Sequence, residues 1–137
     1  TIIRRERFSS AHKLWNPDWD DATNKATFGG CANPNWHGHN YELIVKIKGE
    51  INPETGFVMN LKELSQIINS KIIDKVDHKN LNLDVDFLKN KRTSTEMLAV
   101  SFWEEIEKDI EKQGAKLVNI RINETENNSV EYEGEQG

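Results

Sequence analysis

The alternation of apolar and polar side chains predicts four strands. The first spans residues 2 to 12 and the second residues 37 to 48, and side chains two positions apart share one face of each strand. A third strand surrounds Val118, Ile120 and Ile122, and "VEYEG" predicts a short fourth strand after the turn at "NNS". In the first two strands one face is made of Phe8, Ser10, His12, His37, His39, Tyr41, Leu43, Val45 and Ile47.

Helical spacing of apolar residues marks two segments between the second and third strands. The first helix runs from about Asn60 to Val76, with an apolar stripe made of Leu61, Leu64, Ile68 and Ile72. The second begins at Thr93, which fits an N-cap with Glu96 as its capping-box partner, and ends at Gly114. The order β-β-α-α-β-β predicts an α+β fold, with both helices on one face of a four-stranded antiparallel sheet. Because such a sheet leaves two edges of unpaired backbone, we expect these edges to pair with other copies of the chain.

Length and composition limit the class of protein. The 137 residues predict one domain, residues 1–137, with its own core. The net charge is −5 and the basic runs "IRRERF" and "LKNKR" are short, so we expect no nucleic-acid partner. No apolar run approaches the roughly 18 to 20 residues that span a bilayer, so we expect no membrane partner. A single cysteine excludes an internal disulfide and is typical of a reducing compartment, which predicts a cytoplasmic protein.

Three of the four histidines fall where the first two strands would meet. His37 and His39 project to one side of their strand, roughly 6 to 7 Å apart along it, and can converge on one ion. Antiparallel pairing would bring His12 to the same place. Three protein ligands with an open fourth position are typical of a catalytic zinc site, although imidazole also suits nickel, iron or copper. The alternative is that His37 and His39 are a chance pair of half-exposed strand residues.

The only cysteine, Cys31, lies in the polar segment "FGGCANPN" within a long connection that has no clear periodicity. Long connections of this kind are usually functional in compact domains. A thiol near a dication shifts toward thiolate and can serve as a base or a nucleophile. Cys31 can also be a fourth zinc ligand or simply a small buried side chain.

Other candidates combine carboxylates with a fourth histidine or with a helix start. Asp77 and His78 form either a proton relay or an ordinary helix-end pair. Glu124 lies on a core-facing position, where it either accepts two N–H donors from a pterin or guanine ring or ends a strand at the sheet rim. Thr95 and Glu96 are further candidates, and the alternative for both is an ordinary polar residue in the first turn of a helix.

Together these motifs resemble the 6-pyruvoyl-tetrahydropterin synthase family, which also includes bacterial 6-carboxy-tetrahydropterin synthases. The resemblance covers nearly the whole chain through "FSSAHKL", "FGGCANPNWHGHNYEL", "TGFVMNL", "VDHKNLN", "TSTEMLA" and "ETENN", in that order. It implies the tunnelling fold, in which subunits join edge to edge into a barrel, commonly a trimer stacked into a hexamer. A homo-oligomer is therefore expected.

By position, the resemblance implies three groups of site residues. The ligands of a Zn²⁺ ion would be His12, His37 and His39. The proton-transfer residues would be Cys31, Asp77 and His78. The substrate-binding residues would be Glu124, which anchors the pterin ring, with Thr95 and Glu96 nearby. Because the family's sites lie between subunits, these residues need not all meet within one chain.

The implied activity is that of a lyase acting on 7,8-dihydroneopterin triphosphate. It eliminates triphosphate and rearranges the side chain to give 6-pyruvoyl-tetrahydropterin, which opens the pathway to tetrahydrobiopterin. The alternative is the carboxy-forming relative of queuosine biosynthesis, which releases acetaldehyde; the five residues between Cys31 and His37 favour the pyruvoyl type. A third branch, a side-chain aldolase, replaces the cysteine with glutamate, and Cys31 argues against it. Trp36 and Met97 depart from the common family pattern and bear on substrate preference.

An alternative of another class is a non-enzymatic barrel that binds a pterin or purine and holds a structural metal. Its structure would need no thiolate, so it differs from the enzyme in the role of Cys31.

Overall fold

A computed structural model describes residues 1–12, 14, 16–29 and 37–134, with His37 described by its backbone alone. Cys31 and Trp36 therefore lie outside the described residues. Among the described residues, no helix combines the length and apolar character needed to cross a membrane.

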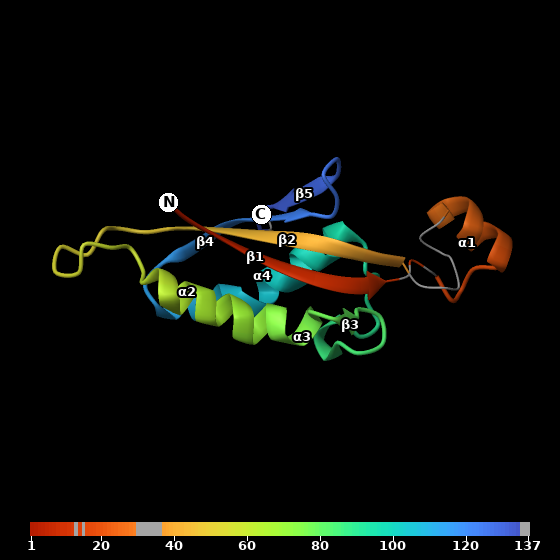
Figure 1. The fold of residues 1–137 in the computed structure, drawn as a ribbon, viewed down its shortest axis with the longest axis horizontal. Helices are drawn as coiled ribbons and strands as arrows, with labels where there is room; N and C mark the ends of the chain where they lie inside the picture. The colour runs from red at the N-terminus through yellow and green to blue at the C-terminus, as the bar shows by residue number, and fades with distance from the viewer. Residues whose placement is uncertain (13, 15, 30–36, 135–137) are drawn as a thin grey trace.

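One sheet organises the chain (Figure 1). Its strands, in the spatial order β3-β1-β2-β4-β5, are β3 (Lys79–Asn80), β1 (Ile2–His12), β2 (His37–Lys48), β4 (Lys116–Asn123) and β5 (Ser129–Tyr132). β1, β2, β4 and β5 pair antiparallel, as the alternation of apolar residues predicts. The two-residue β3 adds a parallel pairing at Ser10 and Ala11 of β1, which the sequence analysis did not anticipate. A pair this short contains too little alternation to be recognised as a strand.

The two long helical segments lie on one face of the sheet, as predicted (Figure 1). The first consists of α2 (Leu61–Ile68), a π-helical turn (Asn69–Ile73) and α3 (Asp74–Val76). The second is α4 (Thr95–Lys112), which is preceded by a short 3-10 turn (Asp86–Leu88). The observed elements confirm the predicted α+β fold.

The apolar stripes of these helices and of the strands form a single core. On β1 and β2 the predicted alternation is observed, since Phe8, Tyr41 and Leu43 are each at most 2% exposed. The Phe8 and Tyr41 rings stack with centroids 4.7 Å apart, and Phe102 of α4 packs its ring edge against Phe8. The buried side of β1 continues from Phe8 through Ser10 to His12, which is 1% exposed. The strand end that carries His12 is therefore packed into the core.

The predicted N-cap at Thr93 is wrong. The cap is Ser94, whose hydroxyl oxygen accepts from the Met97 N–H at 3.3 Å. Thr93 is fully buried, and its hydroxyl donates to Asn82 at 3.1 Å. The hydroxyl that the capping-box pattern assigned to the helix therefore bonds to half-buried Asn82 instead, and Glu96 is exposed on the first turn of α4.

The long connection between β1 and β2 contains a helix that the sequence analysis missed, α1 (Asp21–Phe28). Asn24, fully buried, organises this segment: its Oδ1 accepts from the Asn16 N–H at 2.6 Å and its Nδ2 donates to the Asn16 carbonyl at 3.0 Å and the Asp20 carbonyl at 3.1 Å. The rings of Trp19 and Phe28 stack 5.8 Å apart. The hydrogen bonds of Asn24 hold this segment in place of an apolar stripe, so its apolar residues show no helical periodicity.

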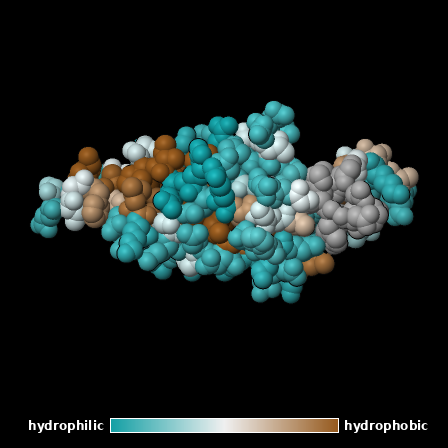
Figure 2. Space-filling model, in the orientation of Figure 1, coloured by the Kyte–Doolittle hydropathy of each residue, from teal (hydrophilic) through white to brown (hydrophobic). Residues whose placement is uncertain are grey.

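Exposed apolar side chains gather at the end of the molecule that carries the connection between β2 and α2 (Figure 2). Ile51, Phe57 and Leu61 belong to this connection or to the start of α2 and are 68%, 43% and 49% exposed. This end lies opposite the strand ends that carry the histidines (Figure 1).

Candidate metal centre

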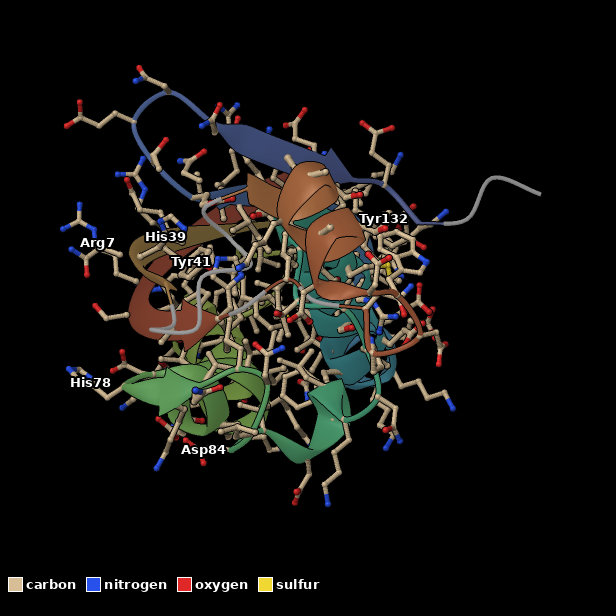
Figure 3. The ribbon with its side chains drawn as sticks, turned by 90° about the vertical axis from the view of Figure 1, so that its right-hand side faces the viewer. Arg7, His39, Tyr41, His78, Asp84 and Tyr132 are labelled. Carbon is tan, nitrogen blue, oxygen red and sulfur yellow. The ribbon has the colours of Figure 1, made fainter. Side chains whose placement is uncertain are left out.

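The pairing of β1 with β2 brings two histidines together. Ser10 lies opposite His39 and His12 lies opposite His37 in the register of the two strands. The imidazole rings of His12 and His39 are 5.2 Å apart between centroids, at an interplanar angle of 67°. The Tyr41 ring contacts both rings edge-on, at 6.3 Å from His12 and 5.5 Å from His39. Figure 3 shows His39 and Tyr41 as neighbours along β2. The core therefore supports the two imidazoles from one side.

Glu124, just beyond the end of β4, completes this cluster. Its Oε1 lies 2.9 Å from Nε2 of His39, and its Oε2 accepts a hydrogen bond from the hydroxyl of Thr95. The ligand atoms offered by His12, His39 and Glu124 all lie within 4.8 Å of one another, the arrangement that a single ion requires. Two imidazoles and a carboxylate fit zinc and also fit iron.

The ring of His12 is held in one orientation by its neighbours. The side chain is 1% exposed, and Nδ1 lies 2.8 Å from the Thr93 carbonyl oxygen. A carbonyl only accepts, so Nδ1 carries the proton. Nε2 is then the nitrogen with a lone pair for a metal. The chemistry of the donor set thus fits a bound cation.

The backbone of His37 lies opposite that of His12 at the same strand ends. Its predicted role as a third imidazole ligand falls on a side chain outside the described residues, as does the predicted role of Cys31. Both assignments stay predictions.

Asp77 and His78 form a pair on the outer edge of β1. Nδ1 of His78 lies 3.1 Å from Oδ2 of Asp77. The other carboxylate oxygen, Oδ1, accepts from the Ser9 N–H at 2.9 Å, and the His78 N–H donates to the Ser9 carbonyl at 2.6 Å. The Ser9 N–H, and secondarily His78, hold the pKa of Asp77 below its ordinary value. His78 adopts a left-handed backbone, with φ of 58°, and its side chain is 83% exposed.

Among the residues that the structure describes, this pair does not join the metal cluster. Figure 3 shows His78 extending outward from the region of β3, away from His39. Both histidines nevertheless line one open cleft of about 500 Å³, together with Ser10, Gly38 and Lys79. A second cleft of about 710 Å³ is also bordered by His39 and is lined by Asn40, Arg121, Asn123 and Glu124. Two members of the metal cluster, His39 and Glu124, therefore border spaces that a ligand can enter.

The two helix-start residues differ in their surroundings. Thr95 is 4% exposed and bonded to Glu124, whereas Glu96 faces solvent on the first turn of α4. Met97, beside it, is 38% exposed.

A family model described as 6-pyruvoyl tetrahydropterin synthase matches residues 1–135. The chain belongs to this family. It is 40% identical over 134 residues to the human protein named 6-pyruvoyl tetrahydrobiopterin synthase, covering 98% of this chain and 91% of the human one. It is 42% identical to the Dictyostelium discoideum protein of that name, covering 98% and 96% of the two chains.

Solved structures agree with the fold. The structure of Caenorhabditis elegans 6-pyruvoyl tetrahydropterin synthase matches with a TM-score of 0.90 and 38% identity, covering 98% of this chain and 94% of that one. The Plasmodium falciparum 6-pyruvoyl tetrahydropterin synthase, at 18% identity and a TM-score of 0.60, is similar in fold alone. The predicted family and the subunit fold of that family are both confirmed, whereas the assembly of subunits into a barrel stays a prediction.

Within this member of the family, two features of the site were not predicted from the sequence. Glu124 was expected to bind a ring, yet its carboxylate also lies among the potential metal ligands. Its core-facing position was the available signal. The bond between His12 and the Thr93 carbonyl had no sequence signal, because a backbone carbonyl is present at every residue.

Proposed function

We propose that the chain is a zinc-dependent 6-pyruvoyl-tetrahydropterin synthase, a lyase that releases triphosphate from 7,8-dihydroneopterin triphosphate. The observation that carries the proposal is the convergence of His12, His39 and Glu124 within 4.8 Å in a chain of this family. The names of relatives 40% to 42% identical to it support the pyruvoyl product over the carboxy product.

The histidines are assigned to the metal. His12 offers Nε2, because its Nδ1–H is committed to the Thr93 carbonyl, and His37 and His39 are the further imidazole ligands. Bound zinc supplies a Lewis acid that polarises oxygen groups of the substrate side chain. The chain's own contribution is to position the imidazoles of His12, which is buried, and of His39 at paired strand ends.

Glu124 is assigned to the pterin ring. Its carboxylate can accept two N–H donors, and the Thr95 hydroxyl fixes its orientation from one side. Glu124 and Asn123 line the same cleft beside His39, which would place a bound ring next to the metal. Glu96 lies on the first turn of α4 beside Thr95, and we assign it a weaker, peripheral part in the pocket.

Proton transfer is assigned to Cys31, Asp77 and His78. A thiolate at Cys31 takes the carbon-bound proton of the substrate, and His78, oriented by Asp77, moves protons during rearrangement. His78 is 83% exposed at the outer edge of β1, so we propose that it serves the site of a neighbouring subunit.

We propose a homo-oligomer, a trimer or a hexamer, and the open edges of the sheet support association between copies. Among the described residues, β3 covers β1 only at Ser10 and Ala11, so Ile2–Phe8 present an edge to solvent. β5 forms the opposite edge. Pairing of these edges between copies would close a barrel. The single cysteine supports a cytoplasmic location for this assembly.

The deciding experiment is incubation of the purified protein with 7,8-dihydroneopterin triphosphate and identification of the products. We expect triphosphate and 6-pyruvoyl-tetrahydropterin. Acetaldehyde as the main small product would assign the carboxy-forming activity, and no triphosphate release would favour the non-enzymatic pterin binder. In parallel, Cys31→Ala should keep zinc and oligomer and lose most turnover, whereas a binder would be indifferent to this change.

A further inference from the structure

His12 ends a chain of hydrogen bonds that runs through two other segments. Its Nδ1 lies 2.8 Å from the Thr93 carbonyl oxygen, and the Thr93 hydroxyl donates to Oδ1 of Asn82 at 3.1 Å. His12 is 1% exposed and Thr93 is fully buried. His12 lies in β1, Asn82 lies in the turn after β3, and Thr93 directly precedes the N-cap of α4. They are far apart in sequence and meet only in the folded protein.

The Thr93 carbonyl selects which nitrogen of His12 faces a metal. Because the carbonyl accepts and cannot donate, it keeps the proton on Nδ1 and leaves the lone pair on Nε2. A half-turn of the ring about the Cβ–Cγ bond would place Cδ2, which makes no such hydrogen bond, against the carbonyl and would move Nε2 away from its present position. The selection works only while the carbonyl stays at its present position.

Asn82 fixes that position. Thr93 lies outside α4, so helical hydrogen bonds do not hold it. Its hydroxyl is instead anchored to Asn82, whose own N–H donates to Oδ1 of Asn80 at 3.0 Å in the turn that follows β3. Two residues further on, the Thr95 hydroxyl bonds to Glu124, so one short segment contacts two members of the metal cluster.

We propose that Asn82 and Thr93 are positioning residues for the metal centre: their hydrogen bond holds the Thr93 carbonyl in place and thereby sets the tautomer and orientation of His12. The inference rests on the proposed function only in requiring that a cation binds at His12. Groups that hold a metal-binding imidazole by its second nitrogen typically change metal affinity by about 10- to 100-fold when they are lost.

The test compares variants that remove the bond with variants that retain it. Thr93→Val and Asn82→Ala remove the donor and the acceptor, whereas Thr93→Ser and Asn82→Asp keep them. Zn²⁺ is the probe, and its dissociation constant is measured by competition with a chromophoric chelator. We expect Thr93→Val and Asn82→Ala to weaken binding by about tenfold or more, while Thr93→Ser and Asn82→Asp stay within about threefold of wild type.

Two further measurements separate positioning from general destabilisation. Ser101→Ala removes a different buried hydroxyl, which lies within α4. It should leave Zn²⁺ affinity unchanged, even where it lowers the Tm of the chelator-treated protein. The imidazole 1H–15N spectrum of the metal-free protein should show the Nδ1–H form of His12 in wild type and a mixture of tautomers in Thr93→Val. If Thr93→Val fails to fold, the half-buried Asn82 provides the deciding variant.

The outcomes distinguish this inference from the proposed function. Wild-type affinity in both Thr93→Val and Asn82→Ala would overturn the positioning role while leaving the metal centre intact. A wild-type protein that binds no Zn²⁺ at this site would instead overturn the proposed metal-dependent function. Equal losses in Asn82→Ala and Asn82→Asp would also overturn the inference, because the acceptor is retained in the second.

Discussion

Glu124 Oε1 lies 2.9 Å from His39 Nε2, on the opposite side of its carboxyl group from the Thr95 hydroxyl. One carboxylate thus joins the start of β2 to the first turn of α4 at the candidate metal centre. Its position fits two roles, a ligand of the metal and an anchor for the pterin ring. Removal of the negative charge would weaken metal binding if Glu124 is a ligand, and it would weaken substrate binding if Glu124 anchors the ring.

Glu124→Gln should raise KM for dihydroneopterin triphosphate about tenfold or more, because an amide cannot accept two N–H donors as a carboxylate does. Zn²⁺ affinity should stay within about threefold of wild type, because three histidines are assigned to the metal. Steady-state kinetics and chelator competition measure the two effects, with the exposed Glu131→Gln as the matched control. A loss of metal with an unchanged KM would instead identify Glu124 as a ligand.

His39→Ala should lower Zn²⁺ affinity by more than about 100-fold, beyond the range produced by groups outside the ligand set. The metal content of the purified protein, measured by atomic spectroscopy, checks this prediction, and circular dichroism confirms the fold. His78→Ala is the control: it removes a histidine that the structure places outside the metal cluster, so its metal content should equal that of wild type. Equal metal content in His39→Ala and wild type would contradict the assignment of the centre.

The acid stability of the protein should depend on Asp77. Its pKa is held below the ordinary value mainly by the Ser9 N–H, so the folded state favours the charged carboxylate. Its contribution is therefore fully present above the ordinary carboxyl pKa and is lost as pH falls through the lower pKa of the folded state.

Asp77→Asn should consequently destabilise the protein near neutral pH and show a weaker loss of stability than wild type below about pH 4. Urea unfolding at a series of pH values measures the effect, with the exposed Asp74→Asn as the control. Parallel stability curves for wild type and Asp77→Asn across this range would show that the bond to Ser9 contributes nothing to acid sensitivity.

Asn24→Ala should loosen the connection that contains α1 without unfolding the sheet. The variant leaves the Asn16 N–H and several carbonyl groups without their buried partner, at a cost of about 1 to 3 kcal/mol confined to this segment. Limited proteolysis should cut between residues 14 and 29 much faster than in wild type, while the main thermal transition stays close to it. The exposed Asn127→Ala serves as a control. Unchanged proteolysis would mean that the segment is held by other contacts.

Sharing of residues between subunits can be tested by mixing two inactive variants. If the thiol of one chain works with His78 of its neighbour, then co-assembly of Cys31→Ala with His78→Ala chains regenerates about a quarter of the sites in intact form. Each variant alone should show almost no turnover. Co-refolded mixtures that stay as inactive as the separate variants would place both residues in a site built by one chain.

The sequence predicted those parts of the fold that depend on regular repetition. The alternation in β1 and β2 placed Phe8, Tyr41 and Leu43 in the core, and parity along the strands brought His12 and His39 to one side. These relationships follow from backbone geometry, which pattern analysis captures directly.

The remainder depends on single contacts between distant segments. Thr93 matches an N-cap by local pattern, but the fold uses its hydroxyl for Asn82 and gives the cap to Ser94. Asn24 is polar and would be expected at the surface. It is fully buried, because its side chain makes hydrogen bonds to backbone groups of the surrounding loop. No local rule contains either partner, so neither contact was visible before the structure.

β1 connects the two chemical parts of the site through its two sides. Its inner side carries His12, and its outer edge holds Asp77 and His78 through the backbone of Ser9, only three positions away. The number of residues between Ser9 and His12 is therefore more constrained than the identity of those residues. Deleting or inserting one residue in this stretch would reverse the inward and outward sides and uncouple the acid–base pair from the cation, a change that no compensating substitution at a single side chain would repair.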